Sequence, residues 1–346
     1  MAIDIYKFLA DSSHPPLIVA EMSGNHNQSL DRAMEIVDAA AAAGAHALKL
    51  QTYTPDTMTF KGVHKIEDKN SLWNGRELHD LYKEAFTPWE WHKPIFERAI
   101  NKGLMIFSTP FDESSVDFLE ELKVPLYKIA SFENTDWPLL TKVASTGKPV
   151  IMSTGAATIA DIDEAVRILR KGGCKDLVLL KCTSTYPALP ENSNILTIPH
   201  MAQLFNCLVG LSDHTMGIGA AVASVALGAR VIEKHFTLKR SDGGVDSAFS
   251  IEPDELKALV IETERAFLSL GTIQYGIQKA EEKSVKFKRS LYVVKDLEQG
   301  ALLTKENLRV IRPGDGLPPK YYELLIGKKV NKPIKAGTPL TFDNLL

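Results

Sequence analysis

The chain has 346 residues, of which 45% are hydrophobic and 24% charged, and its formal net charge is −3. This composition excludes a disordered chain and fits one large α/β domain with a small appendix. The basic residues are scattered along the chain, so no broad surface for nucleic acid is indicated.

The amino terminus does not resemble a secretory signal, because MAIDIYKFLADSSHPP lacks a basic start followed by a sustained apolar core. The apolar run that follows, LIVA, is too short to span a membrane. The three cysteines, Cys174, Cys182 and Cys207, form no CxxC pair and favour a reducing compartment, where small buried cysteines are common. We therefore expect a cytoplasmic protein without a membrane partner.

Eight short β-rich runs alternate with helical periodicity over the first 270 residues. The segments between them, such as SLDRAMEIVDAAAAAG and TIADIDEAVRILRKGG, space apolar residues by three and four and end at glycine, as helices do. Eight units with near-continuous apolar strands predict an α/β fold with parallel pairing, a (β/α)8 TIM barrel. A doubly wound open sheet is the alternative. The runs are LIVAEMS from Leu17, ALKLQTY from Ala47, LMIFSTP from Leu104, LYKIAS from Leu126, PVIMSTG from Pro149, LVLLKCTS from Leu177, LVGLSDH from Leu208 and VIEKHFTL from Val231.

The second strand–helix unit is longer than the others. Residues 54–88 show no clean period before a helix that we expect near residues 89–102. Long loops at the top of a barrel usually shape the substrate site, although a simple surface excursion is an equal alternative.

The pattern changes after Leu270, so we predict a barrel domain over 1–271, a charged linker over 272–290 and a small β-rich module over 291–346. Short strands broken by Gly and Pro characterise the module. A unit of this size buries little surface alone, so we expect it to dock against a barrel.

Polar residues follow every predicted strand at its C-terminal end, where barrel enzymes carry their active sites. A single strand-end lysine, such as Lys181 or Lys234, is more often a snorkelling core side chain. Lysines and hydroxyls at eight neighbouring ends instead suit an anion with several oxygens, a phosphate or a carboxylate. The residues are Glu21, Ser23, Lys49, Gln51, Ser108, Thr109, Lys128, Ser131, Ser153, Thr154, Lys181 to Ser184, Ser212 to His214 and Glu233 to His235.

Two histidines, His214 and His235, end the last two predicted strands. Neutral imidazoles from adjacent strands could bind one divalent metal ion, and nearby carboxylates could complete an N/O site suited to Mn²⁺ or Mg²⁺. The alternative is that each histidine is a hydrogen-bonded core residue. The candidate carboxylates are Glu21, Asp213, Glu233 and Asp246.

Motifs along nearly the whole chain resemble the sialic acid synthase family, whose members make nine-carbon 2-keto acids from phosphoenolpyruvate. They include AEMSGNHNQS, FSTPFDESSVDFL, YKIASFE, VIMSTGAAT, VGLSDHT, ALGARVIEKHFTL and, in the module, the RPGDGLPP of an antifreeze-like (β-clip, SAF) domain. Within the family the chain is most similar to the pseudaminic acid synthases, through NHN, LKLQTYTPDTMT, SLWNGRELHDLYKEAFTPWEWH and CTSTYP. Gln28 and Ser29 depart from the pattern, since many relatives have glycine there.

The resemblance implies a transferase reaction between phosphoenolpyruvate and an N-acetylated amino sugar. C3 of phosphoenolpyruvate would add to the aldehyde of the open-chain sugar, water would add at C2, and phosphate would leave by C–O cleavage. The favoured acceptor is 2,4-diacetamido-2,4,6-trideoxy-L-altrose, and N-acetylneuraminate or legionaminic acid synthase with another N-acetylated hexose is the alternative. The implied cofactor is a divalent metal, Mn²⁺ before Mg²⁺ or Co²⁺.

The matched positions also imply residue roles. His214 and His235 would bind the metal and present the aldehyde oxygen to it, while Asp246 and Glu21 would handle protons. Relatives supply the counterpart of Arg312 from the partner subunit, which implies a domain-swapped homodimer. The sequence does not choose between docking in cis and in trans. Phosphoenolpyruvate would be held by Lys49, Thr109, Lys128, Ser131, Ser153 and Ser212, and the sugar by Asn74, Tyr186 and Arg312.

Two rival interpretations remain at this stage. Other phosphoenolpyruvate-dependent synthases use the same barrel for phosphorylated acceptors, but the strand ends show no second cation cluster for the extra phosphate. A non-catalytic sugar- or ice-binding protein would use the C-terminal module, whose charges, Arg312 and Lys320 among them, suit an ice-binding face poorly.

Overall fold

The computed structural model describes residues 9–69 and 71–346. It divides between Gly271 and Thr272 into two compact units. Each unit has a hydrophobic core of its own, so each is described by itself. The expected linker bounds, 272 and 290, remain a prediction.

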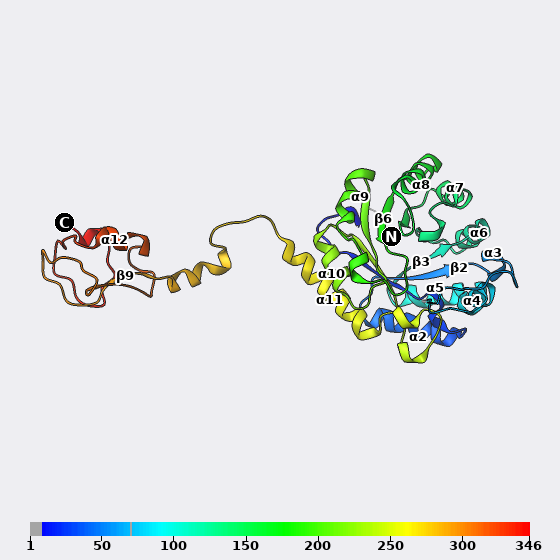
Figure 1. The fold of residues 1–346 in the computed structure, drawn as a ribbon, viewed down its shortest axis with the longest axis horizontal. Coiled ribbons are helices and arrows are strands. Elements are labelled where there is room, and N and C mark those ends of the chain that lie inside the picture. The colour runs from blue at the N-terminus through cyan, green and yellow to red at the C-terminus, as the bar shows by residue number, and fades with distance from the viewer. Residues whose placement is uncertain (1–8, 70) are drawn as a thin grey trace. The chain divides into compact units, whose positions relative to one another are not determined.

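The first unit is built on eight parallel strands that close into a barrel in chain order, as Figure 1 shows. The predicted TIM barrel is therefore confirmed, and the open sheet is excluded. Each of the eight expected runs contains one strand. The strands are β1 (Leu17–Glu21), β2 (Ala47–Thr52), β3 (Met105–Pro110), β4 (Tyr127–Ile129), β5 (Val150–Ser153), β6 (Leu177–Cys182), β7 (Leu208–Ser212) and β8 (Val231–His235).

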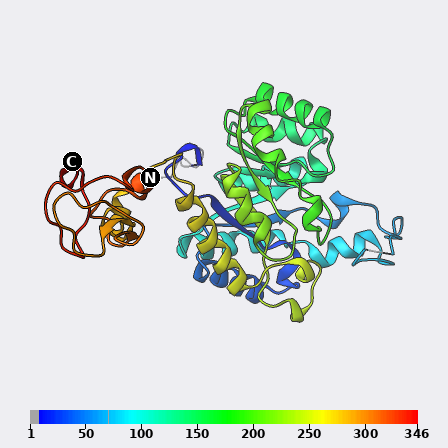
Figure 2. The same ribbon diagram turned by 60° about the vertical axis from the view of Figure 1, so that its left-hand side comes forward.

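Helices surround the barrel (Figures 1 and 2). Local sequence sets their ends: α8 begins after Thr158, whose side chain forms a capping box with Asp161, and ends at Gly173, whose φ of 117° suits glycine. The outer helices are α2 (Leu30–Ala42), α5 (Trp89–Asn101), α6 (Glu113–Glu121), α7 (Trp137–Ser145), α8 (Ile159–Gly172), α9 (Thr197–Phe205), α10 (Gly219–Ala226) and α11 (Pro253–Leu270). No helix among the described residues is long and apolar enough to cross a bilayer.

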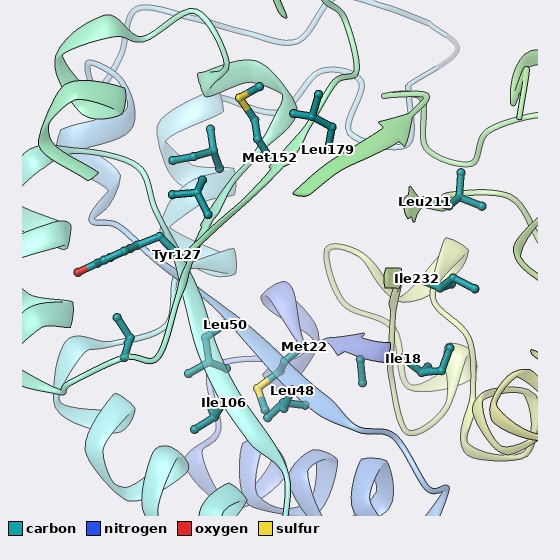
Figure 3. Packing of buried hydrophobic residues seen from close by; sticks show 14 of the residues in the cluster. Ile18, Met22, Leu48, Leu50, Ile106, Tyr127, Met152, Leu179, Leu211 and Ile232 are labelled. Atoms are coloured by element: carbon teal, nitrogen blue, oxygen red, sulfur yellow. The ribbon is translucent and has the colours of Figure 1, made fainter. Parts of the chain in front are cut away.

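Side chains alternate between the inside and the outside of the barrel along every strand. On β1, Leu17 and Val19 belong to a hydrophobic cluster inside the barrel, whereas Ile18 belongs to a second cluster between the barrel and the helices. Figure 3 shows part of this outer cluster, with Ile18 labelled. Space inside is scarce near Gly210 on β7, where an added Cβ would lie 2.1 Å from the carbonyl oxygen of Val231. This alternation decides which strand-end groups face the cavity.

The long connection after β2 carries two helices, α3 (Pro55–Met58) and α4 (Leu78–Ala85). Its apolar residues form a small cluster in which Leu81 packs with Val245, from the loop after β8. The indole nitrogen of Trp73 donates to the carbonyl oxygen of Val245 at 2.9 Å. The connection is therefore fastened beside the end of β8 and is more than a surface excursion.

The second unit is small and β-rich, as expected. Its two-stranded antiparallel sheet pairs β9 (Ser290–Val293) with β10 (Leu308–Ile311), and α12 (Tyr322–Leu325) follows. Leu291, Val293 and Leu308 are fully buried in its core. A 3-10 helix over Lys279–Phe287, without a buried residue, precedes the sheet.

Candidate active site

A cavity of about 400 Å³ lies at the C-terminal ends of the strands. Most of the predicted site residues line it: Lys49, Lys128, Ser131, Ser153, Tyr186, Ser212, His214, His235 and Asp246. Glu21 and Thr109 do not line the cavity themselves, but both contact the ammonium group of Lys49, which does. Asn74 is exposed outside this lining, and Arg312 is exposed on the second unit. The structure thus gathers the residues expected to hold phosphoenolpyruvate and the metal, whereas Asn74 does not line this cavity.

Two lysines and two glutamates form a buried ionic network at the floor of the cavity. The Nζ atom of Lys49 lies 2.8 Å from Glu21 Oε2 and 3.6 Å from Glu233 Oε1, and Lys128 Nζ lies 3.4 Å from Glu233 Oε1. All four residues are buried and lie on strands, at positions whose side chains point into the barrel: β1, β2, β4 and β8 each supply one. Such a network can exchange its internal partners for the oxygens of an anionic ligand.

Burial and charge set the protonation of this network. Burial raises the pKa of Glu21. Burial also acts to raise the pKa of Glu233, but Lys128 and Lys49 outweigh it and lower that pKa. Burial lowers the pKa of Lys128, whereas on Lys49 the two glutamates outweigh burial and raise the pKa. Glu21 is therefore the carboxylate that most readily takes up a proton when a polyanion enters.

Hydroxyl groups surround the lysines on the β4 and β5 side. Lys128 Nζ donates to Ser153 Oγ at 2.8 Å, and the amide of Gly155 donates to Ser131 Oγ at 3.1 Å. A Cβ at Gly155 would lie 2.1 Å from Ser184 Oγ and 2.7 Å from Ser131 Oγ, so glycine keeps these hydroxyls close together. Two ammonium groups ringed by serine hydroxyls fit a ligand with several anionic oxygens.

The two histidine rings lie next to each other in an edge arrangement, with centroids 5.3 Å apart and planes inclined at 61°. His214 Nδ1 lies 2.9 Å from the carbonyl oxygen of Thr183, so in the neutral ring the proton is on Nδ1 and Nε2 can accept. Burial acts to lower the pKa of His214, but the neighbouring Cys182 outweighs it and raises that pKa. Burial lowers the pKa of His235 well below its usual value, so this ring is neutral. The ring of Tyr186 lies 4.5 Å from that of His214, between centroids.

A metal ion fits these histidines. His235 Nδ1 is buried without a hydrogen-bond partner and lies 4.0 Å from Asp246 Oδ2, and the carbonyl bond to His214 is a typical outer contact of a metal-binding imidazole. No group of three or more His, Cys, Asp or Glu side chains able to hold a metal occurs among the described residues. The remaining ligands would therefore come from substrate or water.

Asp246 is held by the loop that follows β1. Its Oδ2 atom accepts a short hydrogen bond from Ser23 Oγ, and Gln51 Nε2 donates to Ser23 Oγ and to Glu21 Oε1, both at 3.0 Å. Asn25 fastens this loop to the β8 side by donating to the carbonyl oxygen of Phe236 at 2.9 Å. Burial raises the pKa of Asp246. Glu21 and Asp246 thus belong to one hydrogen-bonded chain.

Glu133 and Cys182 are among the cavity residues to which the sequence assigned no role in the site. Glu133 follows β4, and burial raises its pKa to about 7. Cys182, expected as a core residue, is buried but also lines the cavity, where His214 outweighs burial and lowers the thiol pKa to about 6. The position of Glu133 just past a strand end was the available signal, and it lay two residues beyond Ser131.

Other strand-end groups lie outside the cavity lining. Asp213 Oδ2 accepts from Lys234 Nζ at 2.8 Å, and both residues are buried away from the lining, so the suggestion that Asp213 is a metal ligand is wrong. Lys181 donates to the carbonyl oxygen of Cys182 and lines a different cavity, beside α8 and α9. The positions of Lys181 and Lys234 therefore fit the alternative considered for them from the sequence, that a strand-end lysine is a core side chain without a role in the site.

Comparison with known proteins places this site in a family. Residues 36–275 match the NeuB family and residues 288–346 match the SAF domain. The chain belongs to the NeuB family. It is 45% identical to the pseudaminic acid synthase of Campylobacter jejuni, over 93% of this chain and 94% of that one. It is 43% identical to the pseudaminic acid synthase of Helicobacter pylori, over 96% and 98%.

A solved structure supports the same family. The N-acetylneuraminic acid synthetase of Leptospira borgpetersenii, crystallised with citrate, matches with a TM-score of 0.71 and 33% identity over 79% of this chain and 91% of that one. The expected membership of the sialic acid synthase family is therefore confirmed, and the chain is an enzyme. Relatives in this family imply phosphoenolpyruvate and an amino sugar as substrates, and the family generally uses a divalent metal.

Proposed function

We propose that this NeuB family enzyme condenses phosphoenolpyruvate with 2,4-diacetamido-2,4,6-trideoxy-L-altrose and water to give pseudaminic acid and phosphate. The observation that carries the chemistry is the presence of a lysine–serine cradle and two adjacent imidazoles in one cavity. The similarity to two pseudaminic acid synthases supports the acceptor. N-acetylneuraminate and legionaminic acid synthases are the related alternatives.

The lysine–serine cradle would bind phosphoenolpyruvate. Lys49 and Lys128 would face its phosphate and carboxylate, and the hydroxyls of Ser131, Ser153 and Ser212 would accept or donate the remaining hydrogen bonds. Thr109 supports this arrangement by accepting from Lys49 Nζ at 3.1 Å. Because Glu21 has a raised pKa, it would take up a proton when the ligand's negative charge replaces it beside Lys49.

The reaction forms one C–C bond and one C–O bond, from water to C2, and breaks the C–O bond to the departing phosphate. C3 of phosphoenolpyruvate attacks the aldehyde carbon, whose oxygen gains a proton, and water adds to C2 and loses protons as phosphate departs with the bridging oxygen. His214 and His235 would hold a divalent ion, which we propose to be Mn²⁺, with Mg²⁺ and Co²⁺ as alternatives. The ion would supply Lewis acidity for the aldehyde oxygen. Asp246 and Glu21, linked through Ser23 and Gln51, are our candidates for moving these protons.

The acceptor would contact Tyr186, whose ring lies over the histidine pair, and we retain Asn74 and Arg312 as proposed contacts. We propose a domain-swapped homodimer in which Arg312 serves the partner's site; its exposure on the second unit leaves it available for such a contact.

The three free cysteines support a reducing compartment, so we propose a cytoplasmic enzyme.

The test is phosphate release from phosphoenolpyruvate by EDTA-stripped protein to which Mn²⁺ is restored. Three acceptors are offered in parallel: the diacetamido-trideoxy-altrose, the legionaminic acid precursor and N-acetylmannosamine. We expect release with the altrose, and no release without metal. Release with N-acetylmannosamine alone would keep the chemistry and overturn the acceptor, whereas no release with any of the three would overturn the proposed function.

A further inference from the structure

The cavity is lined by two unlike sets of side chains. One set comprises the ionic network, the hydroxyls and the histidines, and the other is a group of apolar side chains, the apolar wall, which Tyr53, Trp73 and Tyr82 accompany. Most of the wall comes from the long connection after β2, and single residues come from the loops after β3 and β8. Among the side chains of this wall the one heteroatom is the sulfur of Met58, a weak hydrogen-bond acceptor, and the neighbouring hydroxyls belong to Tyr53 and Tyr82, which also line the cavity. The apolar wall consists of Met58, Ile66, Leu78, Leu81, Phe111 and Val245.

Packing within the protein accounts for only part of this wall. Leu81 and Val245 form a buried cluster, against which Ile66 and Leu78 pack. Met58 and Phe111 line the cavity but belong to none of the hydrophobic clusters among the described residues. Both are half-buried, and Phe111 also packs edge-on against the ring of Tyr53, with 5.2 Å between centroids, so both can present apolar surface to the contents of the cavity.

We propose that the apolar wall selects the acceptor sugar by the methyl group at C6, with Met58 and Phe111 as the determining residues. This inference rests on the proposed function. The aldehyde carbon has to meet phosphoenolpyruvate beside the charged side of the cavity, so the far end of the open-chain sugar extends away from the lysines, and the apolar wall lines the rest of the space. The connection that forms the wall includes TYTPDTMT, in one of the segments that most resemble the pseudaminic acid synthases.

The physical basis is the cost of leaving a hydroxyl without a partner. A C6 hydroxyl placed against Met58 and Phe111 would lose its bound water and meet only the weakly accepting sulfur, whereas a methyl group would gain apolar contact. Hydrophobic pockets reject an isostere that merely adds a hydroxyl by on the order of 100-fold. The wall therefore predicts a preference of about 10- to 100-fold for the 6-deoxy sugar.

The experiment measures kcat/KM for two acceptors that differ only at C6. They are 2,4-diacetamido-2,4,6-trideoxy-L-altrose and 2,4-diacetamido-2,4-dideoxy-L-altrose, which keeps the C6 hydroxyl. Met58→Gln, nearly isosteric and able to bond a hydroxyl, should reduce the preference for the 6-deoxy sugar about tenfold. Phe111→Tyr should shift it in the same direction. Because both acceptors are measured on one preparation, the ratio does not depend on the folded fraction.

Two controls isolate the wall. Met58→Leu keeps an apolar side chain and should keep the preference. Ile100→Gln makes an apolar-to-amide change at a residue of α5 that is 63% exposed and lies outside the cavity lining, and it should leave the ratio unchanged. Equal kcat/KM for both sugars in the unsubstituted enzyme, or an unchanged ratio in both Met58→Gln and Phe111→Tyr, would overturn the proposed selection at C6. Either result would leave the proposed function standing. Absence of turnover with every acceptor would overturn the proposed function and this inference with it.

Discussion

Neighbouring residues at the ends of β7 and β8 differ in whether they line the cavity. Ser212, His214 and His235 line the cavity, whereas Asp213 and Lys234, each adjacent in sequence to a lining residue, pair with each other outside it. All five are polar, and all but the half-buried His235 are buried. The difference shows that a polar strand end is a site residue when it faces inward and a structural ion pair when it faces the helices.

The largest expected effect comes from the inner group. His235→Ala removes one of two proposed metal ligands, so we expect turnover to fall by at least about a thousandfold and Mn²⁺ affinity to fall with it. The barrel should stay folded, because the ring of His235 makes no hydrogen bond at Nδ1. Phosphate release and Mn²⁺ titration check this. Turnover that persists at saturating phosphoenolpyruvate without metal would reject the ligand role.

The outer pair should affect stability instead. Lys234→Met leaves Asp213 buried with its charge unpaired, so we expect the free energy of unfolding to fall by about 3–5 kcal/mol. Lys257→Met, an exposed position on α11, is the control and should change it by less than about 0.5 kcal/mol. Denaturant unfolding measures both. A Lys234→Met protein as stable as its control would show that the pair is dispensable.

The smallest effect comes from a buried histidine on the outer side. His92 on α5 bonds Thr52 of β2 at 2.8 Å through Nε2, and burial lowers its pKa to about 4. Because the unfolded state, with a pKa near 6.5, binds the proton more readily, stability should be full above about pH 6.5 and fall toward pH 4. His92 alone would contribute at most about 3 kcal/mol to this fall.

Unfolding curves between pH 7 and pH 4 test the contribution of His92. His92→Gln should make the loss of stability with acid shallower. Part of the dependence should remain, because burial also lowers the pKa of His26 to about 4. His200→Gln, at an exposed position of α9, is the control. If His92→Gln and His200→Gln showed the same pH dependence as the unsubstituted protein, His92 would not be the titrating group.

The strands were predictable because a strand buried on both faces needs an uninterrupted apolar run, and eight such runs are visible. The cluster of polar groups was predictable because all parallel strands end at one rim. The position of Asp213 outside the cavity was not predicted from the sequence, although the period-two alternation of side chains along a strand places it on the opposite face from His214. Glu133 was missed because nothing in the SFE sequence distinguishes a buried, protonatable carboxyl from an exposed one.

The sequence by itself determined the barrel, the small C-terminal unit and the chemical types at each strand end, because periodicity and composition are local properties. Only the tertiary structure decided which groups share the cavity, which protonation they favour and which loop faces them. Met58 and Phe111, for example, lie on different connections, and their side chains line one wall only because β2 and β3 are neighbours in the closed barrel. Burial and proximity depend on the whole fold, and no short segment encodes them.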